Sequence, residues 1–133
     1  GGASWRPMAL PARLTQVSAL AVDGSGTVWV ADRNGVYYSA GHGASWSTLQ
    51  KLYARNVNSI FYDAASNRLL ITSNGPETEA FAVQLPSLQV RWWDTGWELR
   101  FLRPVGDHLV AATLFDGIVV QPRMVDSPAP AAN

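Results

Sequence analysis

Short runs of β-branched and aromatic residues alternate with turn residues along most of the chain. The first three runs cover residues 17–22, 27–31 and 36–39, and each of the two gaps between them holds Asp and Gly. Apolar runs of roughly four to eight residues are typical of β-strands, and Gly, Asn and Asp supply the backbone conformations of tight turns. This part of the sequence therefore predicts three antiparallel strands joined by hairpins.

The same order of runs and turns returns twice more. The later runs cover residues 58–62, 68–72 and 80–83, and then 98–102, 108–112 and 118–121. Val28, Leu69 and Leu109 occupy equivalent places in the second run of each group. These inner runs are almost continuously apolar, which fits sheets that are packed on both faces. No segment has a helical pattern of useful length.

A near-exact repeat supports this arrangement. The residues Gly-Ala-Ser-Trp at positions 2–5 recur at positions 43–46, an offset of 41, and a blurred third copy can be placed near Trp92. An insertion of about five residues at 76–80 accounts for the longer second spacing. A period near 41 with short strands favours a β-propeller.

We predict an all-β fold of about three four-stranded antiparallel propeller blades. The repeats run near residues 9–50, 51–93 and 94–122, residues 1–8 supply a lone outer strand, and residues 126–133 form a Pro/Ala-rich tail. Because closed propellers need roughly four to eight blades, we expect a fragment of a larger propeller or a protomer that closes as a homo-oligomer. Since residues 98–121 supply three strands but no clear fourth, we expect residues 1–8 to complete that last blade, within one chain or from a neighbour.

Composition narrows the classes of partner. The 133 residues contain ten basic and ten acidic side chains, and only 15% of residues are charged. This balance gives the chain no excess of positive charge that would attract nucleic acid or an anionic membrane surface. The chain has no Cys, and no apolar run approaches the length of a membrane span. We therefore expect neither nucleic-acid binding nor membrane insertion by this segment.

Residues 39–46 carry a recognisable motif. Ser39, Gly43, Ser45 and Trp46 match the pattern Ser/Thr-x-Asp-x-Gly-x-Ser/Thr-Trp, and Gly41 stands at the Asp place. This segment resembles the Asp-box of sialidase-type (BNR) repeat propellers. Its sequence most resembles those of bacterial proteins of the photosystem II stability/assembly factor-like class. The segment also resembles the propellers of sortilin-type receptors and of some glycoside hydrolases.

The resemblance implies a structural role for the motif. In this family the box forms the hairpin turn between the third and fourth strands, and its Trp packs between blades. It therefore implies that Trp46, and Trp5 in the half-copy at residues 2–5, lie in the core. At Gly41 the bracing carboxylate is missing, and we expect glycine to adopt a positive φ there instead.

Candidate catalytic and metal-binding residues are scattered. Asp32, Asp94 and Asp116 lie one per turn, where Asp is selected for its own backbone hydrogen bonds. His42 and His108 have no paired ligand spacing, so no metal site and no cofactor are predicted. Glycoside hydrolysis would need two opposed carboxyl groups. The sequence therefore leans toward a non-catalytic module and names no catalytic residue.

Ligand contacts are expected on the loops where the blade connections converge. In the family, propeller ligands bind at the end of the channel formed by these loops, and loops on a rigid scaffold commonly carry function. We predict contacts through Arg33, Arg55, Trp93 and Trp97, since exposed Trp can stack on a sugar or anchor a protein. Of the adjacent Trp92 and Trp93, one is expected in the core, because neighbouring strand residues point to opposite faces.

Three functions remain open at this point. The first is a non-catalytic propeller module that binds protein or acts as a scaffold, as the photosystem II assembly factor-like resemblance implies. The alternatives are part of a glycoside hydrolase or carbohydrate-binding propeller, and a sensor or receptor ectodomain. The partner would be a protein or a carbohydrate. An extracytoplasmic bacterial location is compatible with all three, and the sequence leaves the compartment open.

Overall fold

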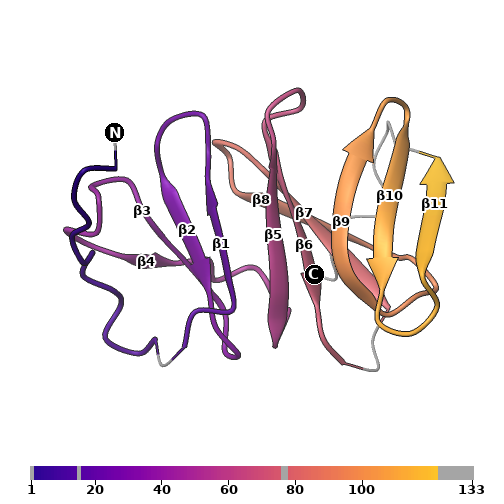
Figure 1. Ribbon diagram of the computed structural model, residues 1–133, viewed down its shortest axis with the longest axis horizontal. Coiled ribbons are helices and arrows are strands. Elements are labelled where there is room, and N and C mark those ends of the chain that lie inside the picture. Colours follow the sequence, from indigo (N-terminus) through magenta and orange to yellow (C-terminus); the bar gives the residue numbers. More distant parts are fainter. Residues whose placement is uncertain (1, 15, 76–77, 123–133) are drawn as a thin grey trace.

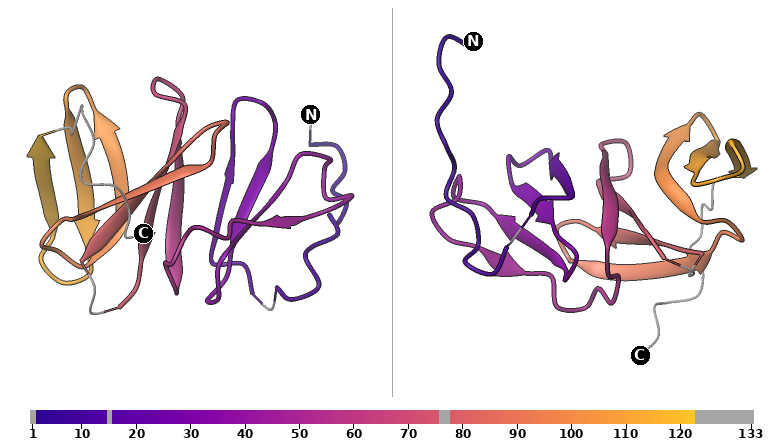
Figure 2. Two further views of the ribbon diagram at one scale, coloured as in Figure 1. Left: turned by 180° about the vertical axis from the view of Figure 1, so that it is seen from behind. Right: turned by 60° about the horizontal axis from the view of Figure 1, so that its bottom comes forward.

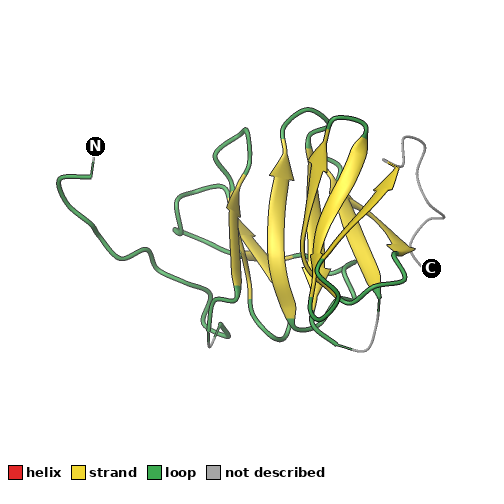
Figure 3. Ribbon diagram, turned by 45° about the vertical axis from the view of Figure 1, so that its right-hand side comes forward, coloured by secondary structure: helices red, strands yellow, loops and turns green. Residues whose placement is uncertain are grey.

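Three antiparallel β-sheets stand side by side (Figure 1). The computed structural model describes residues 2–14, 16–75 and 78–122. Strands and loops make up this part of the chain, with no helix among the described residues (Figure 3). The all-β fold predicted from the sequence is confirmed, and we call the three sheets blades 1, 2 and 3.

Strand order follows chain order within every blade. Blade 1 contains β1 (Ala19–Val22), β2 (Val28–Ala31), β3 (Val36–Ser39) and β4 (Ser47–Thr48). Blade 2 contains β5 (Val57–Asp63), β6 (Arg68–Ser73), β7 (Glu79–Gln84) and β8 (Gln89–Asp94). Blade 3 contains β9 (Leu99–Val105), β10 (His108–Thr113) and β11 (Ile118–Pro122). Each strand thus pairs with its neighbour in sequence through a hairpin.

The turn between β1 and β2 illustrates how these hairpins are fixed. Asp23 Oδ1 accepts hydrogen bonds from the backbone N–H groups of Ser25 (2.9 Å) and Thr27 (3.1 Å). Its Oδ2 accepts a hydrogen bond from Trp29 Nε1 at 2.9 Å. One carboxylate therefore closes the turn and also holds the Trp29 ring in the core.

The largest core lies between blades 1 and 2. Trp29 and Val36 of blade 1 meet Leu69 and Ile71 of blade 2, and all four are almost fully buried. Trp29 also stacks on Tyr38, with ring centroids 4.7 Å apart. Trp29, in the middle of β2, is thus packed between blades 1 and 2.

A second core lies between blades 2 and 3. Leu70, Ala80 and Trp93 of blade 2 pack with Leu102 and other apolar residues of blade 3. Leu70 faces this core, whereas its neighbours in β6 face the first one. Blade 2 is thus apolar on both faces, as the continuous runs predicted, and β5 lies beside both β1 and β9.

The N-terminal arm, residues 2–8, does not complete blade 3 within this chain. The arm contains no strand and projects from the blade 1 end, far from β11 (Figure 2). Trp5 is 93% exposed, so its predicted core position is wrong. The reason is that no earlier strand in this chain stands where β3 stands for Trp46. Within the described residues blade 3 has three strands, and the predicted tail at 126–133 lies outside them.

The Asp-box-like turn forms with one correction. Ser39 Oγ accepts a buried hydrogen bond from the Gly43 N–H at 2.9 Å, and the Ala44 N–H donates to the Gly41 carbonyl at 3.0 Å. The positive φ angles fall on His42 (55°) and Gly43 (88°), so the expectation for Gly41 is wrong. Two hydrogen bonds thus close the turn without the missing carboxylate.

Trp46 lies on the outward face of blade 1 rather than between two of the three blades. It is half-buried and packs against a small cluster of Val28, Val30 and Tyr37. Its Nε1 donates a hydrogen bond to the carbonyl oxygen of Ala9 at 2.9 Å. Trp46 therefore ties the segment after the N-terminal arm to blade 1, while Ser45 beside it is exposed.

Candidate functional site

A hollow of about 400 Å³ opens where the connections of blades 1 and 2 converge. Residues from four segments line it: the approach to β1, the β2–β3 loop, the start of β5 and the β6–β7 loop. Its lining residues are Gln16, Val17, Ser18, Arg33, Asn56, Val57 and Asn74. Three of these four segments, all but the approach to β1, belong to the blade connections where the sequence predicted ligand contacts.

The backbone of Asn56 holds this hollow together. Its N–H donates to the carbonyl oxygen of Arg33 at 3.0 Å, and its own carbonyl accepts from the Asn74 N–H at 2.9 Å. Asn56 has a φ of 54°, a left-handed conformation that asparagine tolerates better than most residues. One residue therefore joins the β2–β3 loop of blade 1 to the β6–β7 loop of blade 2.

A network beneath the hollow extends to blade 3. Asn58 Nδ2 donates to Asn74 Oδ1 at 2.7 Å and to the Leu99 carbonyl at 2.9 Å. The hydroxyl of Thr72 donates to Asn58 Oδ1, and it shares a further hydrogen bond with Ser59. The side chain of Asn74, which lines the hollow, is therefore held by a hydrogen-bonded network that reaches blade 3.

Of the four predicted ligand contacts, one lines this hollow and a second is the residue before a lining residue. Arg33 lines it, and Arg55 immediately precedes Asn56; both side chains are exposed. Guanidinium groups offer several hydrogen-bond donors in a fixed plane, which suits carboxylate groups and other hydrogen-bond acceptors. The site therefore combines positive charge with amide groups from Gln16, Asn56 and Asn74.

The two predicted Trp contacts lie elsewhere. Trp93 is only 8% exposed and belongs to the core between blades 2 and 3, so its prediction as a surface contact is wrong. Period-2 alternation places Trp93 inward and leaves Trp92 half-buried. Trp97 is 41% exposed and borders a separate hollow of about 40 Å³ between the β8–β9 connection and blade 3.

The loop carboxylates are engaged in their own turns. Asp32 is fully buried, and its Oδ1 accepts from the backbone N–H groups of Asn34 (2.7 Å) and Gly35 (3.1 Å). The other oxygen of Asp32 has no hydrogen-bond partner among the described residues. Burial, followed by this carboxylate, raises the pKa of Tyr37.

Asp94 has a similar local role. It accepts hydrogen bonds from the Thr78 hydroxyl and, at 2.9 Å, from the Gly96 N–H. These bonds hold the pKa of the Asp94 carboxyl below its ordinary value of 3.8. Within residues 2–14, 16–75 and 78–122, no three His, Asp or Glu side chains gather as a metal site would require. The same ranges contain no helix that could cross a membrane.

Sequence reasoning missed one wall of the hollow. Gln16, Val17 and Ser18 line it from the approach to β1, but they precede the first strand and carry no motif. The available signal was the repeat itself, because the equivalent approach to β5 contains Arg55 and Asn56. Asn56 and Asn74 lay in loops that were expected to face the ligand, yet neither was named.

The comparisons with known proteins give a fold-level likeness. No protein-family model matches the chain, and no curated protein matches it. Among solved structures, the chain resembles the extracellular domain of a putative one-component system from B. thetaiotaomicron, with a TM-score of 0.61 and 16% identity. The match covers 88% of this chain and 16% of that one, so this chain spans about a sixth of its length. None of these comparisons supports the photosystem II part of the resemblance.

Proposed function

We propose that this chain is a non-catalytic recognition segment in the propeller of an extracytoplasmic sensor or receptor. The observation that carries this proposal is the fold likeness to an extracellular sensor domain, combined with a loop-built hollow between two blades. Rigid sheets that display polar loops at one rim are a common arrangement for ligand recognition. No comparable observation favours a photosystem II assembly role.

The lining of the hollow supports recognition of a polar ligand. Arg33 supplies positive charge in the lining, Arg55 is the exposed residue before Asn56, and the amides of Asn56 and Asn74 can both donate and accept hydrogen bonds. A ligand rich in hydroxyl or carboxylate groups, such as an oligosaccharide or an acidic peptide, fits this chemistry. Asp32 and Asp94 are committed to their own turns, which supports binding without turnover.

Location is the direct test of the proposal. The chain, expressed in its full reading frame and fused to alkaline phosphatase, should give an enzyme that is active only outside the cytoplasm of a bacterial host. The matched control carries green fluorescent protein at the same junction. A fusion whose phosphatase is inactive while the fluorescent partner is bright would refute the sensor proposal.

Ligand recognition is tested separately. We expect the 133-residue chain to release no aryl group from a panel of aryl-glycosides that includes a sialoside, because hydrolysis needs two opposed carboxyl groups. Oligosaccharides and acidic peptides that raise its melting temperature should lose that effect in Arg33→Ala. Arg100→Ala, an exposed change in β9, is the control. Turnover that disappears in Asp94→Asn or Asp116→Asn would favour the glycosidase alternative.

A further inference from the structure

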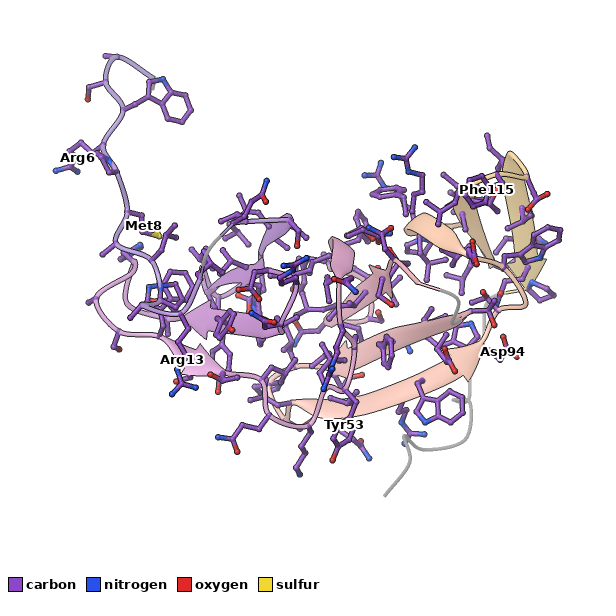
Figure 4. The ribbon with its side chains drawn as sticks, turned by 90° about the horizontal axis from the view of Figure 1, so that it is seen from below. Arg6, Met8, Arg13, Tyr53, Asp94 and Phe115 are labelled. Carbon is purple, nitrogen blue, oxygen red and sulfur yellow. The ribbon has the colours of Figure 1, made fainter. Side chains whose placement is uncertain are left out.

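We propose that the hollow between blades 1 and 2 binds the carboxylate group of a small organic acid. The guanidinium of Arg33 and the amide of Asn74 supply the hydrogen-bond donors, and Asn58 positions the Asn74 amide. This inference rests on the proposed recognition function, because it names the class of ligand that the same hollow takes. The hollow opens at the end of the molecule that faces the viewer in Figure 4.

Asn58 has only one possible orientation of its amide. Its Nδ2 donates to the Leu99 carbonyl oxygen at 2.9 Å, and a backbone carbonyl can only accept a hydrogen bond. The nitrogen end of the Asn58 amide must therefore face Leu99. The other end, Oδ1, accepts a hydrogen bond from the Thr72 hydroxyl. Both ends of this side chain are thus held in a fixed direction.

The Asn58 amide in turn determines which end of Asn74 is free. Asn58 Nδ2 also lies 2.7 Å from Asn74 Oδ1, so Asn74 must present its oxygen to Asn58. The Nδ2 group of Asn74, with two N–H donors, then has no hydrogen-bond partner among the described residues. Because Asn74 lines the hollow, these donors are available to a ligand that accepts hydrogen bonds.

A β-bulge brings Asn58 into this position. The pairing of β5 with β6 shifts by one residue, and Asn58 is the extra residue. Bulges re-aim a side chain and are frequent beside functional sites. Blade 3 has a bulge at the corresponding place, but its extra residue is Arg100, and Ala112 stands where blade 2 has Thr72. The hydrogen-bonded network is therefore a property of blade 2 and not of the repeat.

The fold does not require amide side chains at the hollow. Asn56 directly precedes β5, and its carbonyl accepts a hydrogen bond from the N–H of Asn74, which directly follows β6. Glu98 and Leu114 have the same relation in blade 3, where the Leu114 N–H donates to the Glu98 carbonyl at 2.9 Å. The same backbone contact thus forms with an acid and an apolar residue. The two amides at the hollow are therefore free to serve recognition.

Positive charge in the lining favours an anionic ligand. Arg33 is exposed and has no ion pair within residues 2–14, 16–75 and 78–122. Its guanidinium group has five N–H donors and no acceptor. Asp32, the adjacent acid, is fully buried and does not line the hollow. Since no Asp or Glu stands among the described residues that line it, an ammonium group would find no charged partner there.

The size and the remaining lining of the hollow suit a small molecule. Its volume of about 400 Å³ lies within the roughly 300–1,000 Å³ of small-molecule sites. Val17 and Val57 provide apolar surface that can contact ligand carbon atoms. The Ser18 hydroxyl donates to the Ala31 carbonyl at 3.2 Å, so its oxygen is left to accept a hydrogen bond from the ligand. A carboxylic acid that also carries hydroxyl groups fits this lining.

Three sugars that share one ring test the preference. Titration calorimetry of the chain at neutral pH should detect binding of D-glucuronate and no binding of D-glucosamine. D-glucuronamide should bind about 10-fold or more weakly than D-glucuronate, which is about what one hydrogen bond to a charged group contributes. Succinate is titrated in parallel to separate the sources of the carboxylate. Binding of succinate would mean that any small carboxylic acid suffices, and binding of D-glucuronate alone would mean that the ring contributes.

Asn74→Asp removes the free donors without breaking the network. The new side chain keeps an oxygen that accepts from Asn58, but a second carboxylate oxygen replaces the N–H donors. The dissociation constant of D-glucuronate should rise by about 30-fold or more, because a hydrogen bond is lost and a like charge is added. Gln89→Glu is the matched control, since it makes the same change at an exposed position of β8, at the opposite end of blade 2 from the β6–β7 loop. It should leave the affinity unchanged.

Asn58→Ala tests the positioning role of Asn58. Without Asn58, the Asn74 amide can turn either end toward the hollow. The preference for D-glucuronate over D-glucuronamide should therefore fall toward one, while both sugars still bind. A purely structural role would weaken the binding of both sugars alike. The ratio of the two dissociation constants, measured well below the melting temperature of the variant, separates these cases, and an unchanged ratio would overturn the positioning role.

Failure of this inference and failure of the recognition proposal give different results. Equal affinities for D-glucuronate and D-glucuronamide, both lost in Arg33→Ala, would overturn the carboxylate preference and leave recognition at the hollow intact. An affinity for D-glucuronate that Asn74→Asp does not change would overturn the role of the Asn74 amide. If neither D-glucuronate nor succinate binds, the inference is wrong, even if an acidic peptide does bind. An inactive phosphatase fusion combined with binding of D-glucuronate would refute the extracytoplasmic sensor and not the carboxylate site.

Discussion

A close approach of backbone segments explains the glycine at the centre of the Asp-box-like turn. Gly43 has a φ of 88°, and a Cβ on it would lie 2.5 Å from Met8 Cγ and 2.9 Å from the Ala9 carbonyl oxygen. The Ala9 oxygen is backbone and already accepts the Trp46 indole hydrogen bond, so it cannot move aside freely. Gly43 is therefore required both by conformation and by space.

Gly43→Ala should destabilise the chain by at least about 1–2 kcal/mol, the cost of a left-handed alanine, before any clash is added. Gly41→Ala is the matched control two residues away. Its Cβ would meet only Ala44 Cβ at 3.6 Å, so we expect a change between zero and a gain of about 1 kcal/mol. Urea unfolding of both variants measures the difference, and equal midpoints would contradict it.

Truncation of the two motif tryptophans, Trp46 and Trp5, should destabilise the chain to different extents. A fully buried Trp typically costs about 3–5 kcal/mol on truncation, and Trp46 is half-buried, so we expect about 2 kcal/mol for Trp46→Ala. Trp5→Ala should fall within about 0.5 kcal/mol of wild type, because Trp5 is 93% exposed. Urea unfolding of both variants makes the comparison, and a larger loss for Trp5→Ala would argue against this description.

Asp23 links stability to pH. Burial raises the pKa of its carboxyl, but hydrogen bonds from the Ser25 hydroxyl, the Trp29 indole and the turn backbone outweigh that effect and hold it below 3.8. A depressed carboxyl pKa stabilises the fold above the unfolded value, and this contribution is lost as pH falls through the folded value.

Asp23→Asn removes this titration. The wild type should therefore be more stable than the variant at pH 7, and the gap should close as pH falls below about 4. Urea unfolding followed by tryptophan fluorescence at several pH values makes the measurement. A gap that stays constant down to pH 2 would show that the charge of Asp23 contributes nothing.

At the scale of elements, the alternation of apolar runs and turns predicted all three blades. It succeeded because each strand pairs with its sequence neighbour, so local pattern and tertiary pairing agree. Residues 2–8 form no strand within this chain for the opposite reason. A strand needs a partner edge, and identical residues at 2–5 and 43–46 meet such an edge only in the second case.

Asn58 joins elements of two blades. Asn58→Ala would leave the Leu99 carbonyl and the Thr72 hydroxyl without one partner each. Unsatisfied buried groups cost about 1–3 kcal/mol, and we expect a loss in that range. Asn34→Ala, on the exposed turn after β2, should change stability by less than about 0.5 kcal/mol. Thermal or urea unfolding of both variants measures these losses of stability. Similar losses would mean that the Asn58 network contributes no more to stability than the exposed turn does.

At the scale of the whole molecule, only part of the candidate site could be predicted. Arg33 and Arg55 were chosen as loop residues, and the Asn56 backbone brings their segments together. Trp93 was misplaced because two adjacent tryptophans give no indication of which one faces the core. The wall formed by Gln16, Val17 and Ser18 carries no motif, and only its equivalence to the approach to β5 in the repeat could have pointed to it.

The order of the sheets also determines which blades open first in the native state. Every blade forms from consecutive residues, and blade 2 alone has a neighbour on both sides. In such a linear stack, opening starts at the ends and reaches the middle last. Amide hydrogens of β6 should therefore exchange with deuterium more slowly than those of β2 and β10 in dilute solution.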